Sequence, residues 1–171
     1  MATGSGAAAL EGARPTVVIH ITVHYNVRVL SIRALLEGAY DGRAGRMRTS
    51  LLDLGVLRAH FPARLLPASV VDSIGIELRD PVANAGAAQP IMLPAWVLAD
   101  GTVCPFTPPF DSPLLIPDPL RRGVYPVIHH RNHVSAACAQ MIPAGVTAAE
   151  CDMTSGADMY LDGNAANVGF L

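Results

Sequence analysis

The sequence contains no lysine, and all twelve of its positively charged residues are arginines. The lack of lysine excludes a phosphate-binding loop of the Walker type, a Schiff-base lysine and a lysine–asparagine crosslink. Charged residues of all kinds are scarce, at 15% of the chain against about 25% in an average protein. The formal net charge is −2 and the arginines are scattered, so no basic surface for a nucleic-acid backbone is predicted.

Cysteines and long apolar runs are also few. Cys104, Cys138 and Cys151 are the complete set, and no two have the CxxC spacing of a zinc knuckle, so buried free thiols are expected. No stretch approaches the roughly 20 apolar residues of a membrane-spanning helix. Residues 1–14 lack the apolar segment of a secretion signal. A soluble chain with a flexible leader at 1–14 is expected, and MATGSG has the composition of an appended leader, which leaves the natural leader open.

Short β-type patterns dominate residues 15–171, which have the length of one domain. Residues 16–24 alternate in the manner of a half-buried strand, with an apolar face made of Val17, Ile19, Ile21 and Val23. Alternation recurs in NVRVLSIRA and in VVDSIGIELRD, where Ile74, Ile76 and Leu78 are expected to point inward. Asp100-Gly101 lies between two apolar runs and predicts a hairpin with a type I′ turn.

Other segments interrupt these strands. MRTSLLDLGVL, residues 47–57, predicts a short helix or turn with a shared face of Met47, Leu51 and Leu54 and an end at Gly55. TPPFDSPLLIPDP holds five prolines and is expected to be an extended loop, because proline cannot pair in a central strand.

Residues 144–171 are expected to form a polar tail after a family-like core at about 30–140. Many short strands, frequent turn residues and the near absence of long amphipathic helices favour an all-β protein. The predicted fold is an antiparallel β-sandwich, immunoglobulin-like or jelly-roll-like, with a short helix or helical turn near 47–57.

Residues 129–133, HHRNH, hold three of the six histidines. The surrounding GVYPVIHHRNHVSAACA is expected to be one long strand or a pair of strands. In one continuous strand, alternate residues share a face, which would group His129 with Arg131 and His133, and His130 with Asn132. Buried histidines bonded to backbone carbonyls or to Glu77 would then fix the strand register without any ligand.

A metal site is the alternative for this cluster. His129 and His133 on one strand face would chelate zinc if a third ligand came from His20 or His24. Such a site would suit a metal-binding protein or a metal-dependent hydrolase. Without it, the sequence predicts no metal and no cofactor.

No set of residues defines a catalytic centre. None of the serines lies in a GxSxG elbow, and the acidic pairs are explained more simply by turns and strand faces, so a non-enzymatic protein is expected. Trp96 and Tyr125 are candidates for a sugar-binding surface. A lone tryptophan in an apolar strand is more often part of the core.

Four segments in order, LLEGAYDGRAGRMRTSLLDLGVL, VVDSIGIELRD, LADGTV and GVYPVIHHRNHVSAACA, resemble a module of large secreted, adhesin-like proteins of Bacteroidetes and related bacteria. That module normally precedes a C-terminal sorting or dockerin-like segment. The chain departs from the pattern at Ser73, where an aromatic residue is expected. The matching positions that are candidates for binding are Glu37, Tyr40, Asp41, Glu77, Arg79, His130, Arg131, Asn132 and His133.

The resemblance implies a non-enzymatic structural or interaction module, located outside the cell or on its surface. Its expected partners are other copies of itself, other surface proteins or glycans, with no nucleic acid and no insertion into a membrane. Residues 16–24 have no counterpart in the family pattern. Their alternation suits pairing with an exposed sheet edge of another subunit, which would build an oligomer or filament. The alternative is an ordinary edge strand of the same sheet.

Overall fold

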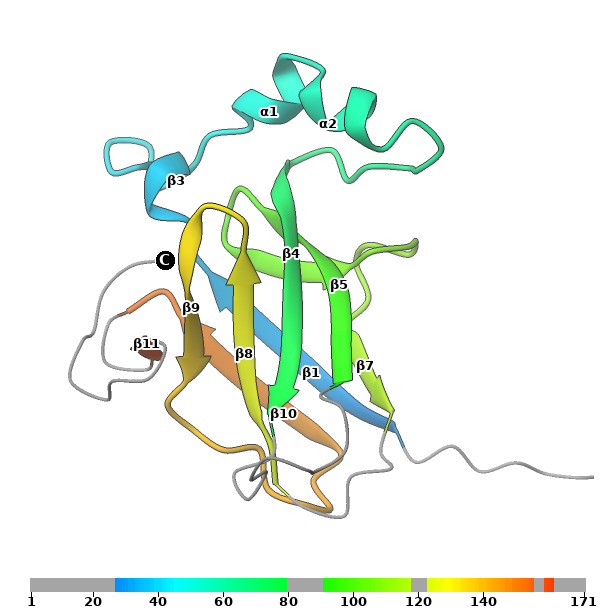
Figure 1. The fold of residues 1–171 in the computed structure, drawn as a ribbon, viewed down its shortest axis with the longest axis vertical. Helices are drawn as coiled ribbons and strands as arrows, with labels where there is room; N and C mark the ends of the chain where they lie inside the picture. The colour runs from blue at the N-terminus through cyan, green and yellow to red at the C-terminus, as the bar shows by residue number, and fades with distance from the viewer. Residues whose placement is uncertain (1–26, 80–90, 118–122, 156–158, 162–171) are drawn as a thin grey trace, which may run out of the picture.

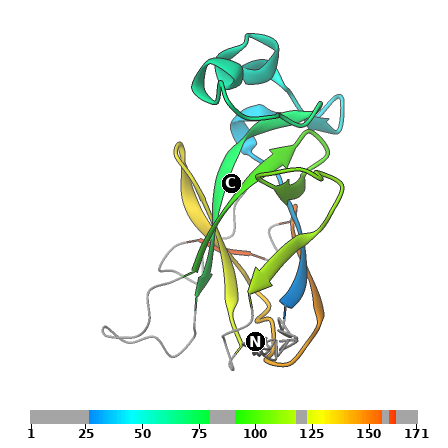
Figure 2. The ribbon, with the colours of Figure 1, turned by 90° about the vertical axis from the view of Figure 1, so that its right-hand side faces the viewer.

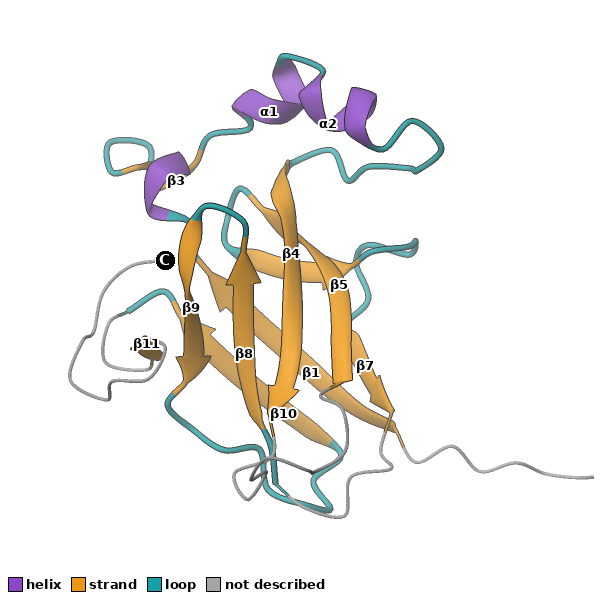
Figure 3. Ribbon diagram, viewed as in Figure 1, coloured by secondary structure: helices purple, strands orange, loops and turns teal. Residues whose placement is uncertain are grey.

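The computed structural model describes residues 27–79, 91–117, 123–155 and 159–161, and the structural statements below concern these residues. The predicted strand 16–24, with His20 and His24, lies outside them. In chain order the elements are β1 (Val27–Ala34), η1 (Glu37–Ala39), β2 (Tyr40–Asp41), β3 (Arg46–Met47), α1 (Ser50–Asp53), α2 (Val56–His60), β4 (Val70–Arg79), β5 (Ile91–Leu98), β6 (Thr102–Pro105), β7 (Leu114–Pro117), β8 (Tyr125–His130), β9 (His133–Cys138), β10 (Ala148–Met153) and β11 (Met159–Leu161) (Figures 1 and 3).

Nine of these strands share one hydrogen-bonded sheet in the order β10-β1-β6-β5-β4-β8-β9-β11, with β7 also paired to β1. The sheet bends over on itself, so that β9, β8, β4 and β5 form one layer in front of β1, β10 and β7 (Figures 1 and 2). Among the described strands, the pairing of β1 with β10 is parallel and the other pairings are antiparallel. The predicted antiparallel β-sandwich with a short helical segment is confirmed.

The main core fills the space between the two layers. Ile74, Ile76 and Leu78 of β4 point into it, as their alternation predicts, and each is at most 5% exposed. Leu30 and Ile32 of β1 meet them from the opposite layer. Burial of one such side chain contributes roughly 1.5–3 kcal/mol, so these strands supply much of the stability of the sandwich.

A second, smaller core lies on the outer face of β5. Ala95 and Val97 point into the main core, so Trp96 between them points the other way and is covered by the helical segment. The Trp96 ring stacks on Phe106 at a centroid distance of 4.3 Å and meets Phe61 edge-on at 5.0 Å. Because Trp96 is 0% exposed, it is a core residue and does not present a sugar-stacking surface.

The segment 47–57 contains the predicted short helix, but it is divided in two. Met47 ends β3 and is buried in the main core, whereas α1 and α2 follow as two short helices separated by Gly55. Gly55 has a φ of +74°, a left-handed conformation that favours glycine and ends α1 as predicted. Leu54 is 77% exposed, so the predicted shared face of Met47, Leu51 and Leu54 is wrong: the break at Gly55 comes before a second turn can form.

The hairpin predicted at Asp100-Gly101 connects β5 to β6, but its turn type differs. Gly101 has a φ of +87°, and no described residue other than glycine has a positive φ. A type I′ turn requires two positive φ values, so this connection is instead a three-residue loop that ends in a left-handed glycine. The backbone N–H of Gly101 donates to the carbonyl of Leu98 at 2.9 Å, which closes the loop.

Two segments that were expected to lack strands contain them. Residues 114–117 of the proline-rich stretch form β7, which pairs with β1 only, and an edge position tolerates proline because its N–H side faces away from the ladder. Residues 148–153 of the predicted polar tail form β10, which buries Cys151 and Met153. Small and sulfur-containing residues give a weak hydrophobic pattern, which explains why the sequence did not indicate this strand.

All three cysteines are buried and free of disulfides, as expected. Burial, together with the nearby charge of Asp100, raises the pKa of the Cys104 thiol to about 11, so this thiol is protonated at neutral pH and packs as a small apolar group. Within the described part of the chain, no helix is both long enough and apolar enough to span a membrane.

Candidate functional site

The HHRNH segment forms the tight connection between β8 and β9. His130 and His133 lie opposite each other across the hairpin, with Arg131 and Asn132 at its tip. Since the chain reverses direction here, the predicted grouping of His133 with His129 on one strand face is wrong. The pair of strands that the sequence also allowed is what forms, and it brings His133 to the side of His130.

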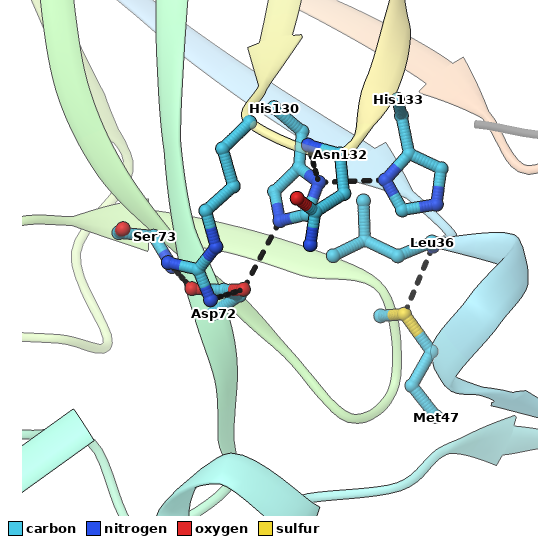
Figure 4. Close-up of polar contacts among 8 residues, drawn as sticks. Leu36, Met47, Asp72, Ser73, His130, Asn132 and His133 are labelled. Atoms are coloured by element: carbon cyan, nitrogen blue, oxygen red, sulfur yellow. Dashed lines mark hydrogen bonds and ion pairs between the residues drawn. The ribbon is translucent and has the colours of Figure 1, made fainter. Parts of the chain in front are cut away.

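Asp72 of β4 anchors this hairpin tip. Its Oδ2 accepts hydrogen bonds from His130 Nε2 at 3.0 Å and from Arg131 Nη2 at 2.7 Å, and its Oδ1 accepts one from the amide of Ser73 at 2.8 Å (Figure 4). His130 Nδ1 lies 2.6 Å from His133 Nδ1. A register shift between Val70 and Asp72 marks a bulge in β4 at this point, and Asp72 lies in a core-facing position two residues before Ile74. We call Asp72, His130, Arg131 and His133 the Asp72 network.

The protonation of the two histidines follows from their fixed neighbours. The amide N–H of Asn132 can only donate, and it points at His130 Nδ1 at 3.4 Å, so His130 Nδ1 accepts. His130 Nε2 therefore carries the proton that is donated to Asp72. For the short contact between the two Nδ1 atoms to be a hydrogen bond, His133 must donate from Nδ1, which leaves its Nε2 as an acceptor.

The pKa shifts of Asp72 and His133 set the charges of these two side chains. Burial alone would raise the pKa of Asp72, but the hydrogen bonds from His130 and Ser73 and the charge of Arg131 outweigh burial and hold this pKa below its usual value. Burial lowers the pKa of His133, and the nearby His130 lowers it further, while Glu37 and Asp72 oppose this shift. Asp72 is thus an anion and His133 is neutral at neutral pH.

We predict that these shifts make the protein less stable in acid. Because the pKa of His133 is lowered, the unfolded chain binds a proton near pH 6.5 that the folded chain does not, and stability falls below that pH. The lowered pKa of Asp72 gives stability that is complete above about pH 5 and is lost as the pH falls through about 4 and below. Urea unfolding at a series of pH values should show a smaller loss below pH 5 in Asp72→Asn than in the exposed control Asp111→Asn; equal losses would contradict the prediction.

A second polar group lies on the outer face of the same layer. His129 Nε2 is 2.7 Å from Glu77 Oε2, and His129 Nδ1 is 2.7 Å from Ser135 Oγ. Arg79 donates from Nε and Nη2 to the two oxygens of Glu77 at 2.9 and 3.1 Å. The hydrogen bond from Arg79 is the largest cause that lowers the pKa of Glu77, followed by that from His129, against the opposing effect of burial. Glu77 is one of the two kinds of histidine partner that the sequence predicted, the other being backbone carbonyls.

The candidate binding residues of the family pattern are divided between these two groups. His130, Arg131 and His133 belong to the Asp72 network, whereas Glu77 and Arg79 belong to the outer face. Tyr40 and Asp41 form β2, where Asp41 Oδ1 accepts hydrogen bonds from the amides of Arg43 and Ala44 in the turn before β3. Glu37 opens η1 beside His133, where its charge acts on the imidazole.

The predicted metal ligands do not converge. His129 contacts Glu77 and Ser135, whereas His133 contacts His130, so the two predicted zinc ligands bind different partners. No three or more histidine, cysteine, aspartate or glutamate side chains in the described segments are grouped so as to hold a metal ion. His20 and His24, the predicted third ligands, lie outside these segments.

A cavity of about 560 Å³ opens beside the Asp72 network, at the end of the sandwich near η1 and α1. We call it the His133 cavity. It is lined by Leu36, Gly38, Ala39, Arg48, Ser50, Leu51, Val71, Asp72, His130, Asn132 and His133. Sequence reasoning did not single out Asp72 or Arg48 as site residues. Asp72 stands at the start of an apolar alternation and Arg48 within a turn-rich segment, and neither pattern indicates a site.

Comparison with known proteins adds no identification, since no family model, no curated protein and no solved structure matches this chain.

Proposed function

We propose that this protein is a non-enzymatic structural and interaction module of the cell surface or extracellular space, related to the adhesin-like modules its sequence resembles, and that its copies associate by strand addition. The observation that carries the proposal is a pair of strand edges on one side of the sandwich that have no partner among the described strands. In β5, residues 91–94 pair with β4, but β6 pairs only with residues 95–97. Among the described strands, β7 pairs with β1 alone.

The groove between these two edges is apolar. It has a volume of about 460 Å³ and is lined by residues of β5, β7 and the proline-rich loop, among them Leu93, Leu114 and Leu115. Leu115 is 58% exposed. Unpaired backbone groups together with exposed apolar side chains form a template for an added strand, which would satisfy both.

The proposed occupant is segment 16–24 of a second copy. Its apolar face of Val17, Ile19, Ile21 and Val23 suits the groove, and its other positions suit solvent. Only residues 25 and 26 separate the segment from β1, which is the length of a tight hairpin. Both edges of β1 are already occupied, since β7 pairs with residues 27–30 and β10 with residues 29–34, so a hairpin within the same chain has no free edge to join.

Light scattering and electron microscopy of the full chain and of a variant lacking residues 1–24 test this proposal. The full chain should form concentration-dependent oligomers or filaments, because each subunit donates a strand and accepts one. The shortened chain should be a folded monomer that binds a synthetic peptide of residues 16–24. Ile19→Asp with Ile21→Asp should also give a monomer.

The matched control for the added charge is Ala7→Asp with Ala8→Asp in the leader, which should assemble as the unchanged chain does. A monomeric full chain, or a shortened chain that fails to fold, would overturn the proposal, since the first shows no association and the second shows that the segment belongs to its own domain.

A further inference from the structure

The His133 cavity has the composition of a small-molecule site and lies apart from the groove of the proposed strand addition. Its volume of about 560 Å³ is within the usual range of ligand pockets, roughly 300–1,000 Å³. Leu36, Leu51 and Val71 give it an apolar wall, and Arg48, Asn132 and His133 give it polar groups. A mostly apolar pocket with a few convergent polar groups is typical of sites that bind an organic ligand.

His133 offers a hydrogen-bond acceptor to this cavity. The Asn132 amide N–H that points at His130 Nδ1 makes this atom an acceptor, and with His133 donating to it from Nδ1, His133 Nε2 carries the lone pair. A Cβ atom placed on Gly38 would lie 4.0 Å from His133 Nε2, which puts this nitrogen across from a residue that has no side chain. The anchor of His130 on Asp72 fixes the orientation of both rings. The acceptor is therefore held in place before any ligand arrives.

Arg48 supplies the positive charge. Its backbone N–H donates to the carbonyl of Ala39 at 2.8 Å, which fixes the chain just after β3 at the cavity wall. Arg131, the other arginine near the hairpin tip, is already paired with Asp72 at 2.7 Å. Asp72 also lines the cavity, but its negative charge is balanced by Arg131, and Glu37 lies outside the group of lining residues, so the unbalanced charge of the lining is the positive charge of Arg48. A guanidinium in this place favours a planar carboxylate, which it can bind with two hydrogen bonds.

We propose that the His133 cavity binds a small hydroxylated carboxylate of about the size of a uronic acid. In this arrangement, Arg48 binds the carboxylate, a ligand hydroxyl donates to His133 Nε2, and the side-chain amide of Asn132 binds a further hydroxyl. Leu36 and Leu51 pack against the carbon skeleton. The proposal does not depend on strand addition, since the site is complete within one chain.

Titration of the full chain with glucuronate and with glucose, followed by ¹H–¹⁵N NMR, tests the proposal. Glucuronate should bind with a Kd on the order of 1 mM and shift the His133 imidazole and Asn132 side-chain signals. Glucose has no carboxylate and should bind at least about tenfold more weakly. Arg48→Gln should reduce glucuronate binding to the level of glucose, and His133→Phe should weaken both ligands.

The matched control is Arg46→Gln, which removes another exposed arginine, in β3, that does not line the cavity. It should leave glucuronate binding unchanged. Gly38→Val should block both sugars, because its side chain enters the space in front of His133, while the rest of the spectrum reports an intact fold. Equal binding of glucose and glucuronate, equal effects of Arg46→Gln and Arg48→Gln, or no saturable shift with glucuronate would each overturn the proposal.

Discussion

Replacement of Asp72 by alanine is expected to lower the free energy of unfolding by about 3 kcal/mol. Asp72 is 3% exposed and accepts hydrogen bonds from His130, Arg131 and the amide of Ser73. Its loss leaves the His130 ring, whose side chain is also only 3% exposed, with a buried N–H that has no acceptor. A buried donor without a partner costs about 1–3 kcal/mol, and the lost charge-assisted bond to Arg131 adds to this.

Asp72→Asn should cost about half as much, roughly 1.5 kcal/mol, because the amide oxygen can still accept from His130 but carries no charge for Arg131. Urea unfolding measures both values. Asp111→Ala, at an exposed aspartate in the proline-rich loop, is the control and should change stability by less than about 0.5 kcal/mol. If Asp72→Ala were as mild as that control, the network would not anchor the hairpin tip.

Replacement of Trp96 by alanine is expected to cost about 4 kcal/mol, the largest effect of any single change considered. Trp96 is fully buried, stacks on Phe106 and contacts Phe61, and its Nε1 donates to the carbonyl of Phe106 at 3.2 Å. Its removal opens a cavity under the helical segment and removes the Trp96 contacts of Phe61 and Phe106, which still meet each other edge-on. The loss should also release α2, which contributes Leu57 to the same small core.

Thermal unfolding followed by circular dichroism, and proteolysis of the helical segment, measure this effect. Trp96→Phe should cost less than half as much, since a ring remains to stack on Phe106 although the N–H is gone. The control is Leu65→Ala, because Leu65 is 71% exposed and should contribute less than about 0.5 kcal/mol. A cost below about 1 kcal/mol for Trp96→Ala would show that the small core does not hold the helical segment on the sandwich.

The candidate site was only partly predictable, and its residues show why. The cluster HHRNH stands out in the sequence, and so does Glu77 as a partner for a histidine. Asp72 did not, because the bond that gives it a role joins it to His130 across 58 positions of the chain. The same applies to Arg48, whose place on the cavity wall depends on how β3 packs beside the hairpin tip. Local pattern indicates which side chains are unusual, but it does not say which of them meet.

The amino-acid sequence by itself determined the elements whose signal is local. Alternation at period two defined β1 and β4 and the inward face of β4, and Asp100-Gly101 defined the hairpin between β5 and β6, since these patterns depend on neighbouring residues alone. Only the tertiary structure decided that β7 and β10 are strands, that His133 turns back beside His130, and that Trp96 packs under the helices. These features depend on contacts between distant segments, which compete with and override weak local preferences.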